Sequence, residues 1–258
     1  MTAVFSDVAG FSSISEKMEP DELVVLLNEY LSEMTDIVLK YGGILDKYEG
    51  DAIMAFFGAP LDDPEHTKKC CLMALEMQER LAELRREWQK QGKPQLRVRI
   101  GINTGPMVVG NMGSKVRMDY TIMGDAVNLA SRLEGVNKEY GTEIIISQDT
   151  YEACREEIEV RELDSIRVVG KKEAVAIYEL LCRKGELAPE KKAMLKLYVQ
   201  GLNLYKNRQW DEAITIFGEI FDKDPDDGPS LTYLERCLDY RINDPGPDWD
   251  GVHTMQFK

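Results

Sequence analysis

The sequence predicts an α+β fold, a ferredoxin-like (split βαβ) core with added elements, followed by a small α-helical C-terminal segment. Up to residue 102, the apolar patterns follow the order strand, helix, hairpin, helix, strand. Residues 96–102 alternate strictly between apolar and polar side chains, which indicates a strand with one buried face. Residues 195–242 show helical periodicity instead, so we expect the helices to follow the sheet as a separate segment.

The opening of the chain predicts a strand and two helices. Residues 3–7 form a short apolar strand that ends at Asp7. The turn after it, and the short helix predicted over residues 11–19, present backbone N–H groups of the kind that bind phosphate oxygens. Residues 20–41 predict a long helix, because proline suits its first turn and apolar residues recur at three- and four-residue spacing.

Residues 43–58 predict a β-hairpin, with an apolar run on each side of residues 48–50. Asp51 is expected at the start of the returning strand. Asp7 and Asp51 would then lie at the ends of neighbouring strands, at one edge of the sheet. Two such carboxylates are able to hold two hard cations about 3.5–4 Å apart, which is the arrangement of two-metal phosphoryl chemistry.

The rest of the main domain follows the same two periodicities. Asp125 is a good N-cap for a helix over residues 125–140, and a second long helix is predicted over residues 62–91. The other predicted elements are a strand over 96–102, a second hairpin over 105–113, the approach to the next helix over 119–123, a strand over 143–147, a short helix over 148–154 and strands over 159–169 and 174–181.

The C-terminal part divides into three pieces, after a main domain over residues 1–184. We expect a charged linker over 185–193, a helical segment over 194–242 and an irregular tail over 243–258. The helical segment carries the spacing of a single tetratricopeptide-type repeat, at Gly201, Leu204, Ala213, Phe217 and Pro225. One repeat cannot bury its own apolar face, so it is expected to dock on the main domain, on a partner or on a second copy.

The composition excludes several classes of protein. A net charge of -14 argues against a binder of nucleic acid polymers, which shows a basic face. The five scattered cysteines indicate reduced thiols and a cytoplasmic location, and no apolar run is long enough for a membrane segment. His66 and His253 fall in polar stretches, which argues against histidine-based catalysis. The chain opens almost directly on a strand, so we expect an upstream sensor domain in a fuller protein.

Three side chains suggest a nucleotide site. Asn128 and Arg132 are spaced i and i+4 on one predicted helix, so they share a face. Arg132 offers a forked cation for a phosphate, and Asn128 offers an amide for a ribose oxygen. Thr121 lies seven residues before Asn128, just ahead of the helix. Alone, such a pair is usually a surface feature.

The sequence around these residues resembles class III nucleotidyl cyclases, in particular a bacterial branch that includes soluble, bicarbonate-responsive adenylyl cyclases. The resemblance covers about residues 1–182 and rests on three motifs in the right order. These are residues 5–11 (FSDVAGF), 46–54 (DKYEGDAIM) and 120–134 (YTIMGDAVNLASRLE). They are similar to the opening metal motif, the second metal motif and the transition-state helix of the family.

The resemblance implies a role for each matching residue. The metal ligands would be Asp7, Asp51 and the carbonyl of Val8, and two Mg²⁺ or Mn²⁺ ions per active site are expected. The purine selectors would be Lys47 and Thr121, the ribose-orienting residue Asn128 and the residue that stabilises charge at the α-phosphate Arg132. The implied reaction is in-line attack of the ribose 3′-oxygen on the α-phosphorus of ATP, which yields cyclic AMP and pyrophosphate.

The purine preference also follows from hydrogen-bond chemistry. Adenine presents an acceptor at N1 and a donor at N6, which a lysine and an accepting hydroxyl complement. Guanine presents the opposite pattern, although a lysine is still able to reach its O6. A guanylyl or dual-specificity cyclase therefore stays open as an alternative, as does a non-catalytic pseudo-cyclase that senses nucleotide.

The family also implies a head-to-tail homodimer. Its metal aspartates come from one protomer, and the remaining site residues come from the other. One departure concerns the lysine that holds the β- and γ-phosphates in the family, because Val169 stands at that position here. Lys171 is expected to take over part of its role in binding substrate.

Overall fold

The computed structural model describes residues 1–167 and 174–254. The main domain contains β1 (Thr2–Val8), α1 (Phe11–Ser15), α2 (Pro20–Lys40), β2 (Ile44–Glu49), β3 (Ala52–Phe57), α3 (His66–Lys90), β4 (Val98–Thr104), β5 (Val108–Ser114), β6 (Arg117–Met123), α4 (Asp125–Tyr140), β7 (Ile144–Ser147), α5 (Gln148–Cys154), β8 (Ile158–Arg167) and β9 (Val175–Arg183). The helices α6 (Pro189–Lys206), α7 (Trp210–Lys223) and α8 (Gly228–Ile242) and the short strand β10 (His253–Thr254) follow.

The main sheet confirms the predicted α+β fold with a split βαβ core. Within the described residues it has eight strands in the order β10-β8-β9-β7-β4-β1-β3-β2. The strands β4, β1, β3 and β2 form the ferredoxin-like part, and β1 lies antiparallel between β3 and β4. The register pairs Asp7 with Arg99 and Ser6 with Ile53, so the end of β1 lies beside the β2–β3 turn.

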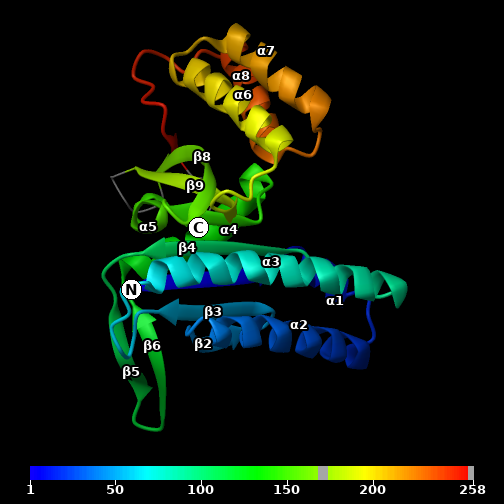
Figure 1. Cartoon of the computed structure of the whole chain (residues 1–258), viewed down its shortest axis with the longest axis vertical. Helices are drawn as coiled ribbons and strands as arrows, with labels where there is room; N and C mark the ends of the chain where they lie inside the picture. The colour runs from blue at the N-terminus through cyan, green and yellow to red at the C-terminus, as the bar shows by residue number, and fades with distance from the viewer. Residues whose placement is uncertain (168–173, 255–258) are drawn as a thin grey trace.

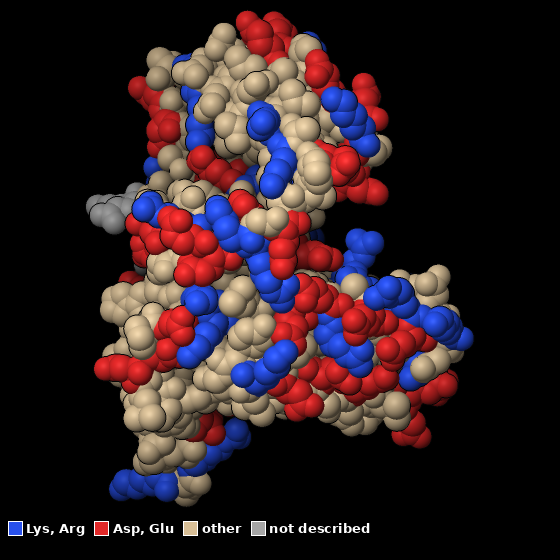
Figure 2. All heavy atoms as spheres, in the orientation of Figure 1, with Lys and Arg blue, Asp and Glu red and all other residues tan. Residues whose placement is uncertain are grey.

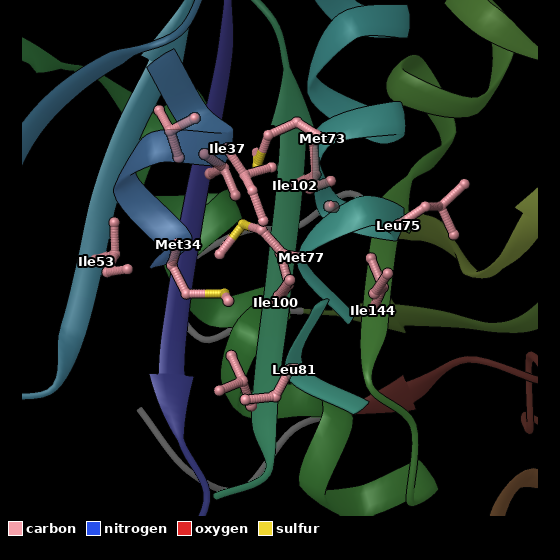
Figure 3. Packing of buried hydrophobic residues seen from close by; sticks show 14 of the residues in the cluster. Met34, Ile37, Ile53, Met73, Leu75, Met77, Leu81, Ile100, Ile102 and Ile144 are labelled. Carbon is pink, nitrogen blue, oxygen red and sulfur yellow. The ribbon is translucent and has the colours of Figure 1, made fainter. Parts of the chain in front are cut away.

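The two faces of the sheet are covered by different helices. The helices α2 and α3 run side by side over one face (Figure 1). Their apolar side chains point toward the strands, as Figure 3 shows for Met34 of α2 and Met77 of α3 beside Ile100 of β4. The helix α4 packs on the other face of β4. Gly101 permits this close approach, because a Cβ there would lie 2.2 Å from the backbone nitrogen of Glu134.

The helices α6 to α8 form a compact unit at the end of the molecule opposite the β5–β6 hairpin (Figure 1). Their own core is aromatic, built around Tyr198, Phe217 and Tyr233. The unit contacts the main domain through buried polar groups, since the hydroxyl of Tyr233 donates to the carbonyl of Leu163 on β8 at 2.5 Å. Of the three expected docking partners of the helical segment, the structure shows the main domain.

Several predicted elements lie elsewhere. The second hairpin comprises residues 108–123 rather than 105–113, so the stretch 119–123 belongs to β6 and is not merely an approach to α4. Asp51 lies in the turn, immediately before β3. The tail is not wholly irregular, because His253 pairs in parallel with Ile166 of β8. His66 is the first residue of α3, and its Nδ1 lies 2.7 Å from the hydroxyl of Thr2. His66 is therefore in a helix and not in a loop, whereas His253 lies in the tail.

The boundaries after the sheet also differ, since α6 begins at Pro189, inside the stretch expected to be a linker. All five cysteines lie in the described ranges and are free. Among the residues that the structure describes, no helix is both long and apolar enough to cross a bilayer. On the face seen in Figure 2, acidic and basic side chains are intermixed over most of the surface.

Candidate active site

Two carboxylates meet at the end of β1. The side chain of Asp51 reaches back from the β2–β3 turn, and its Oδ2 accepts from the backbone N–H of Val8 at 3.1 Å. Burial raises the pKa of Asp51, and the neighbouring carboxylate of Asp7 raises it further. The structure therefore brings together the two aspartates and Val8, the three residues expected to be metal ligands.

A cation fits this arrangement chemically. Carboxylate and carbonyl oxygens are the ligands that Mg²⁺ and Mn²⁺ favour. Burial and, after it, the like charge of Asp7 disfavour the ionised form of Asp51 and raise its pKa, and a bound cation would offset both effects. Within the described ranges, no group of three or more histidine, cysteine, aspartate or glutamate side chains is placed to hold a metal. A site here therefore depends on this pair and on backbone oxygen.

Arg99 connects the carboxylate pair to helix α4. Its Nη2 lies 3.3 Å from Oδ2 of Asp7, and its Nε lies 3.0 Å from Oε1 of Glu134. Burial raises the pKa of Glu134 to about 7, although the charge of Arg99 opposes that rise. Arg99 therefore contacts the carboxylate of Asp7 and is itself held by Glu134 of α4.

A second cluster lies where β2 meets β6. Nζ of Lys47 lies 3.5 Å from the hydroxyl oxygen of Thr121, so the two expected purine selectors are neighbours. Between them lies the carboxylate of Asp46, whose side chain is fully buried. Thr121 donates its hydroxyl hydrogen to Oδ2 of Asp46, while Oδ1 lies 3.2 Å from Nζ of Lys47.

Asn128 and Arg132 both lie on α4, as expected. Asn128 is exposed and Arg132 is partly buried. An α-helix has 3.6 residues per turn, so Asn128 lies about 120° and Arg132 about 160° around the helix axis from Glu134. They therefore leave α4 on a different side from the one that faces Asp7 and Asp51.

Sequence reasoning missed Asp46, Arg99 and Glu134. Asp46 directly precedes Lys47, and Glu134 closes the third motif, so position in a motif was the available signal for both. Arg99 carried only the signal of a polar residue in an alternating strand. Val169 and Lys171 lie outside the described residues.

The chain matches the family model described as the adenylate and guanylate cyclase catalytic domain over residues 1–181. A protein of Rhizobium meliloti named adenylate cyclase 1 is 39% identical over 181 residues, which are 70% of this chain and 27% of that protein. The terminal-differentiation specific adenylate cyclase of Dictyostelium discoideum is 36% identical over 249 residues, which are 92% of this chain and 11% of that protein. The chain thus spans well under half the length of these relatives.

A solved structure extends the comparison to the fold. The crystal structure of the adenylyl cyclase CyaB from P. aeruginosa is 41% identical, with a TM-score of 0.67. The match covers 72% of this chain and 96% of that one. The likeness therefore spans nearly the whole of the solved domain, while the match in Dictyostelium must also include part of the helices that follow it.

Proposed function

This chain belongs to the family of adenylate and guanylate cyclase catalytic domains, and we propose that it converts ATP to 3′,5′-cyclic AMP and pyrophosphate. Two clusters of side chains carry the proposal. One consists of hard oxygen ligands at Asp7 and Asp51, and the other is a lysine donor beside a hydroxyl acceptor. The adenylate cyclases at 39% and 41% identity support the same reaction.

In this proposal Asp7, Asp51 and the carbonyl of Val8 hold Mg²⁺ or Mn²⁺, two ions per site. When bound, such ions make the ribose 3′-hydroxyl more acidic and neutralise phosphate charge. Side chains bind the base. Lys47 donates to N1 of adenine and Thr121 accepts from its N6 amino group. Binding of the base by this pair orients the nucleotide.

The helix α4 supplies the remaining groups. Asn128 hydrogen-bonds the ribose and so aims the 3′-oxygen at the α-phosphorus. Arg132 presents its guanidinium to the α-phosphate and stabilises the charge that develops there. Lys171 is proposed to contact the triphosphate, and the replacement of the family lysine by Val169 is expected to weaken that contact.

We further propose that the active form is a head-to-tail homodimer. Asn128 and Arg132 leave α4 on a different side from Glu134, which faces the carboxylate pair through Arg99. One chain is therefore poorly arranged to bring both sets to a single nucleotide. Two chains related by a two-fold axis would form two complete sites. Each site would take the metal ligands from one protomer, and Lys47, Thr121 and the α4 residues from the other.

The division of the chain follows from the same proposal. Residues 1–184 would form the catalytic domain, 185–193 a connection, 194–242 a tetratricopeptide-like segment and 243–258 a tail. The helical segment, or a domain upstream of the catalytic one, would receive a regulatory signal. A cytoplasmic location remains a prediction.

Two other functions compete with the proposal. The family includes guanylate cyclases, so a guanylyl or dual-specificity enzyme is one alternative. A pseudo-cyclase is the other, although the aspartates, Asn128 and Arg132 are all present in the sequence.

The deciding experiment measures product formation by the purified chain with ATP or GTP, with Mg²⁺, Mn²⁺ or excess chelator, over a range of protein concentrations. We expect cyclic AMP from ATP, a specific activity that rises with protein concentration, and no product after chelation. Preferred turnover of GTP would support the guanylyl alternative. A folded dimer that binds ATP but forms no product would support the pseudo-cyclase.

A further inference from the structure

The carboxylate of Asp46 lies between the two residues proposed to select the base, and the sequence motifs assign it no role. Its side chain has no exposed surface. Burying a carboxylate is costly unless charged or donating partners surround it. Here the partners of Asp46 are the side chains of Lys47 and Thr121.

A β-bulge makes this arrangement possible. Leu45 pairs with Ala55 and Lys47 pairs with Met54, the next residue back, so Asp46 is the extra residue on β2. Successive side chains on a regular strand point to opposite faces, whereas a bulge redirects one of them. Asp46 and Lys47 are therefore both able to reach Thr121 on β6.

The hydrogen bond between Thr121 and Asp46 has a fixed direction. A hydroxyl carries one hydrogen and two lone pairs, and a carboxylate paired with an ammonium group has no hydrogen to give. Thr121 therefore donates its hydrogen to Asp46, and its oxygen can only accept from other groups. Lys47, an ammonium group, can only donate.

We propose that Asp46 is a positioning residue that sets the base preference of the site by fixing the hydroxyl of Thr121 as an acceptor. The inference rests on the proposed function and deepens it. With Asp46 in place, the site offers a donor to N1 and an acceptor to the 6-position, which matches adenine. Guanine in the same pose places its N1–H against the ammonium of Lys47 and its O6 against the lone pairs of Thr121, so both contacts are mismatched.

The test replaces the carboxylate by its neutral isostere in the full chain. In Asp46→Asn the amide is able to donate to Thr121, which frees the hydroxyl hydrogen to point at O6 of guanine. We expect the ratio of kcat/KM for ATP to that for GTP to fall about tenfold or more, the effect of one reversed hydrogen bond. A change confined to folding would lower turnover of both nucleotides equally and leave the ratio unchanged.

Binding of three nucleotide analogues gives a readout that does not depend on turnover and tests single hydrogen bonds. Dissociation constants of 3′-deoxy-ATP and 3′-deoxy-GTP, which lack the attacking hydroxyl, should lose their difference in Asp46→Asn. Purine riboside triphosphate lacks the 6-amino group that Thr121 would accept from. The natural chain should prefer ATP to this analogue, and Asp46→Asn should not.

The controls test whether Asp46 acts through the hydroxyl of Thr121. Thr121→Val should reduce the ATP preference, and adding Asp46→Asn to it should change the ratio by less than about twofold, because both act through one group. Asp222→Asn, an exposed change on α7, should leave the ratio unaltered. If Asp46→Asn does not fold, Asp46→Ala replaces it with the same expectation, since the hydroxyl is then free to rotate.

The outcomes distinguish this inference from the proposed function. Suppose that the natural chain turns over ATP, and that Asp46→Asn and Asp46→Ala both keep the natural chain's ratio of kcat/KM for ATP to that for GTP. The role of Asp46 is then overturned, and the cyclase assignment stands. If the natural chain binds neither 3′-deoxy nucleotide, both are overturned. The role of Asp46 would also be overturned if Asp46→Asn lowered the ATP/GTP ratio as much in the Thr121→Val background as in the natural chain. The carboxylate would then act through a group other than the hydroxyl of Thr121.

Discussion

At the scale of single residues, the clearest feature is a pair of carboxylates that repel each other. The pKa of Asp51 is raised by burial and by Asp7, so the unliganded pair is destabilised. The backbone N–H of Val8 and the guanidinium of Arg99 hold the two side chains in place against that repulsion. Such a pair is what a site prepared for divalent cations requires.

Substitution of Asp51 tests this assignment. Asp51→Asn keeps the size of the side chain and an oxygen for the N–H of Val8, but removes one negative charge. Loss of a metal ligand of this kind removes several kcal/mol of transition-state stabilisation, so turnover with Mg²⁺ should fall about 1,000-fold. The measurement is the initial rate of cyclic AMP formation. Asp222→Asn serves as the matched control and should keep full activity, whereas retained activity in Asp51→Asn would refute the two-metal assignment.

Sequence reasoning found the residues whose signal is local. Asp7 ends an apolar run, Asp51 directly precedes one, and Asn128 and Arg132 are spaced to share one face of a helix. Arg99 could not be found in this way. Its role depends on the register that sets it opposite Asp7, and that register exists only once β4 lies beside β1.

At the scale of elements, the junction between the sheet and α8 is a buried ionic cluster. Arg161 on β8 contacts Glu179 on β9 at 2.5 Å and Asp227 at the start of α8 at 2.7 Å. Burial raises the pKa of Glu179. Burial alone would also raise the pKa of Asp227, but the charge of Arg161 and the hydroxyl of Ser230 lower it to about 2. Arg161 therefore serves as counter-ion to both buried carboxylates, and Lys191 adds a second cation 3.0 Å from Oδ1 of Asp227.

Removal of that arginine should loosen the helices from the sheet. Arg161→Met fills similar space but leaves Asp227 and Glu179 without their shared counter-ion, which should cost about 3 kcal/mol or more of the free energy of unfolding. Urea unfolding followed by tryptophan fluorescence measures it. The control is Lys206→Met, which breaks the exposed ion pair with Glu162 and should cost less than about 1 kcal/mol. Equal losses in both variants would show that the cluster does not hold the junction.

The elements that sequence patterns predicted well are those with one buried face. The helices α2 and α4 lie where their apolar stripes predicted them, because those stripes meet the sheet. The N-cap of α4 is Gly124, however, and the predicted N-cap, Asp125, is the first residue of the helix. The β5–β6 hairpin was misplaced for the opposite reason. Most of its side chains are exposed or only partly buried, so no alternation of buried and exposed residues marks its strands.

At the scale of the whole molecule, α4 joins the helical segment to the site. A Cβ at Gly228 would lie 2.3 Å from the carbonyl oxygen of Tyr140, so α8 rests directly on the last turn of α4. Arg236 of α8 reaches Asp164 at 2.6 Å, and the hydroxyl of Tyr140 donates to the same carboxylate at 2.6 Å. The sequence left this docking face open among three possibilities, since an amphipathic face does not identify its partner.

The two faces of α4 lead to a prediction about assembly. Glu134 faces the carboxylate pair of its own chain through Arg99, while Arg132 lies about 160° away around the helix. If catalysis uses Asp51 of one protomer and Arg132 of the other, chains carrying Asp51→Asn or Arg132→Ala should each be inactive alone. A heterodimer of the two contains one site that has lost both groups and one site that is intact.

Mixing the two variants should therefore restore activity. Random pairing at equal amounts makes about half of the dimers heterodimers, each with one working site out of two, so recovery should approach about a quarter of the natural activity. Cyclic AMP formation is measured after the chains have exchanged, with differently tagged chains co-purified to count heterodimers. Heterodimers without recovered activity would mean that each site is built within one chain, and the opposed faces of α4 would then need another explanation.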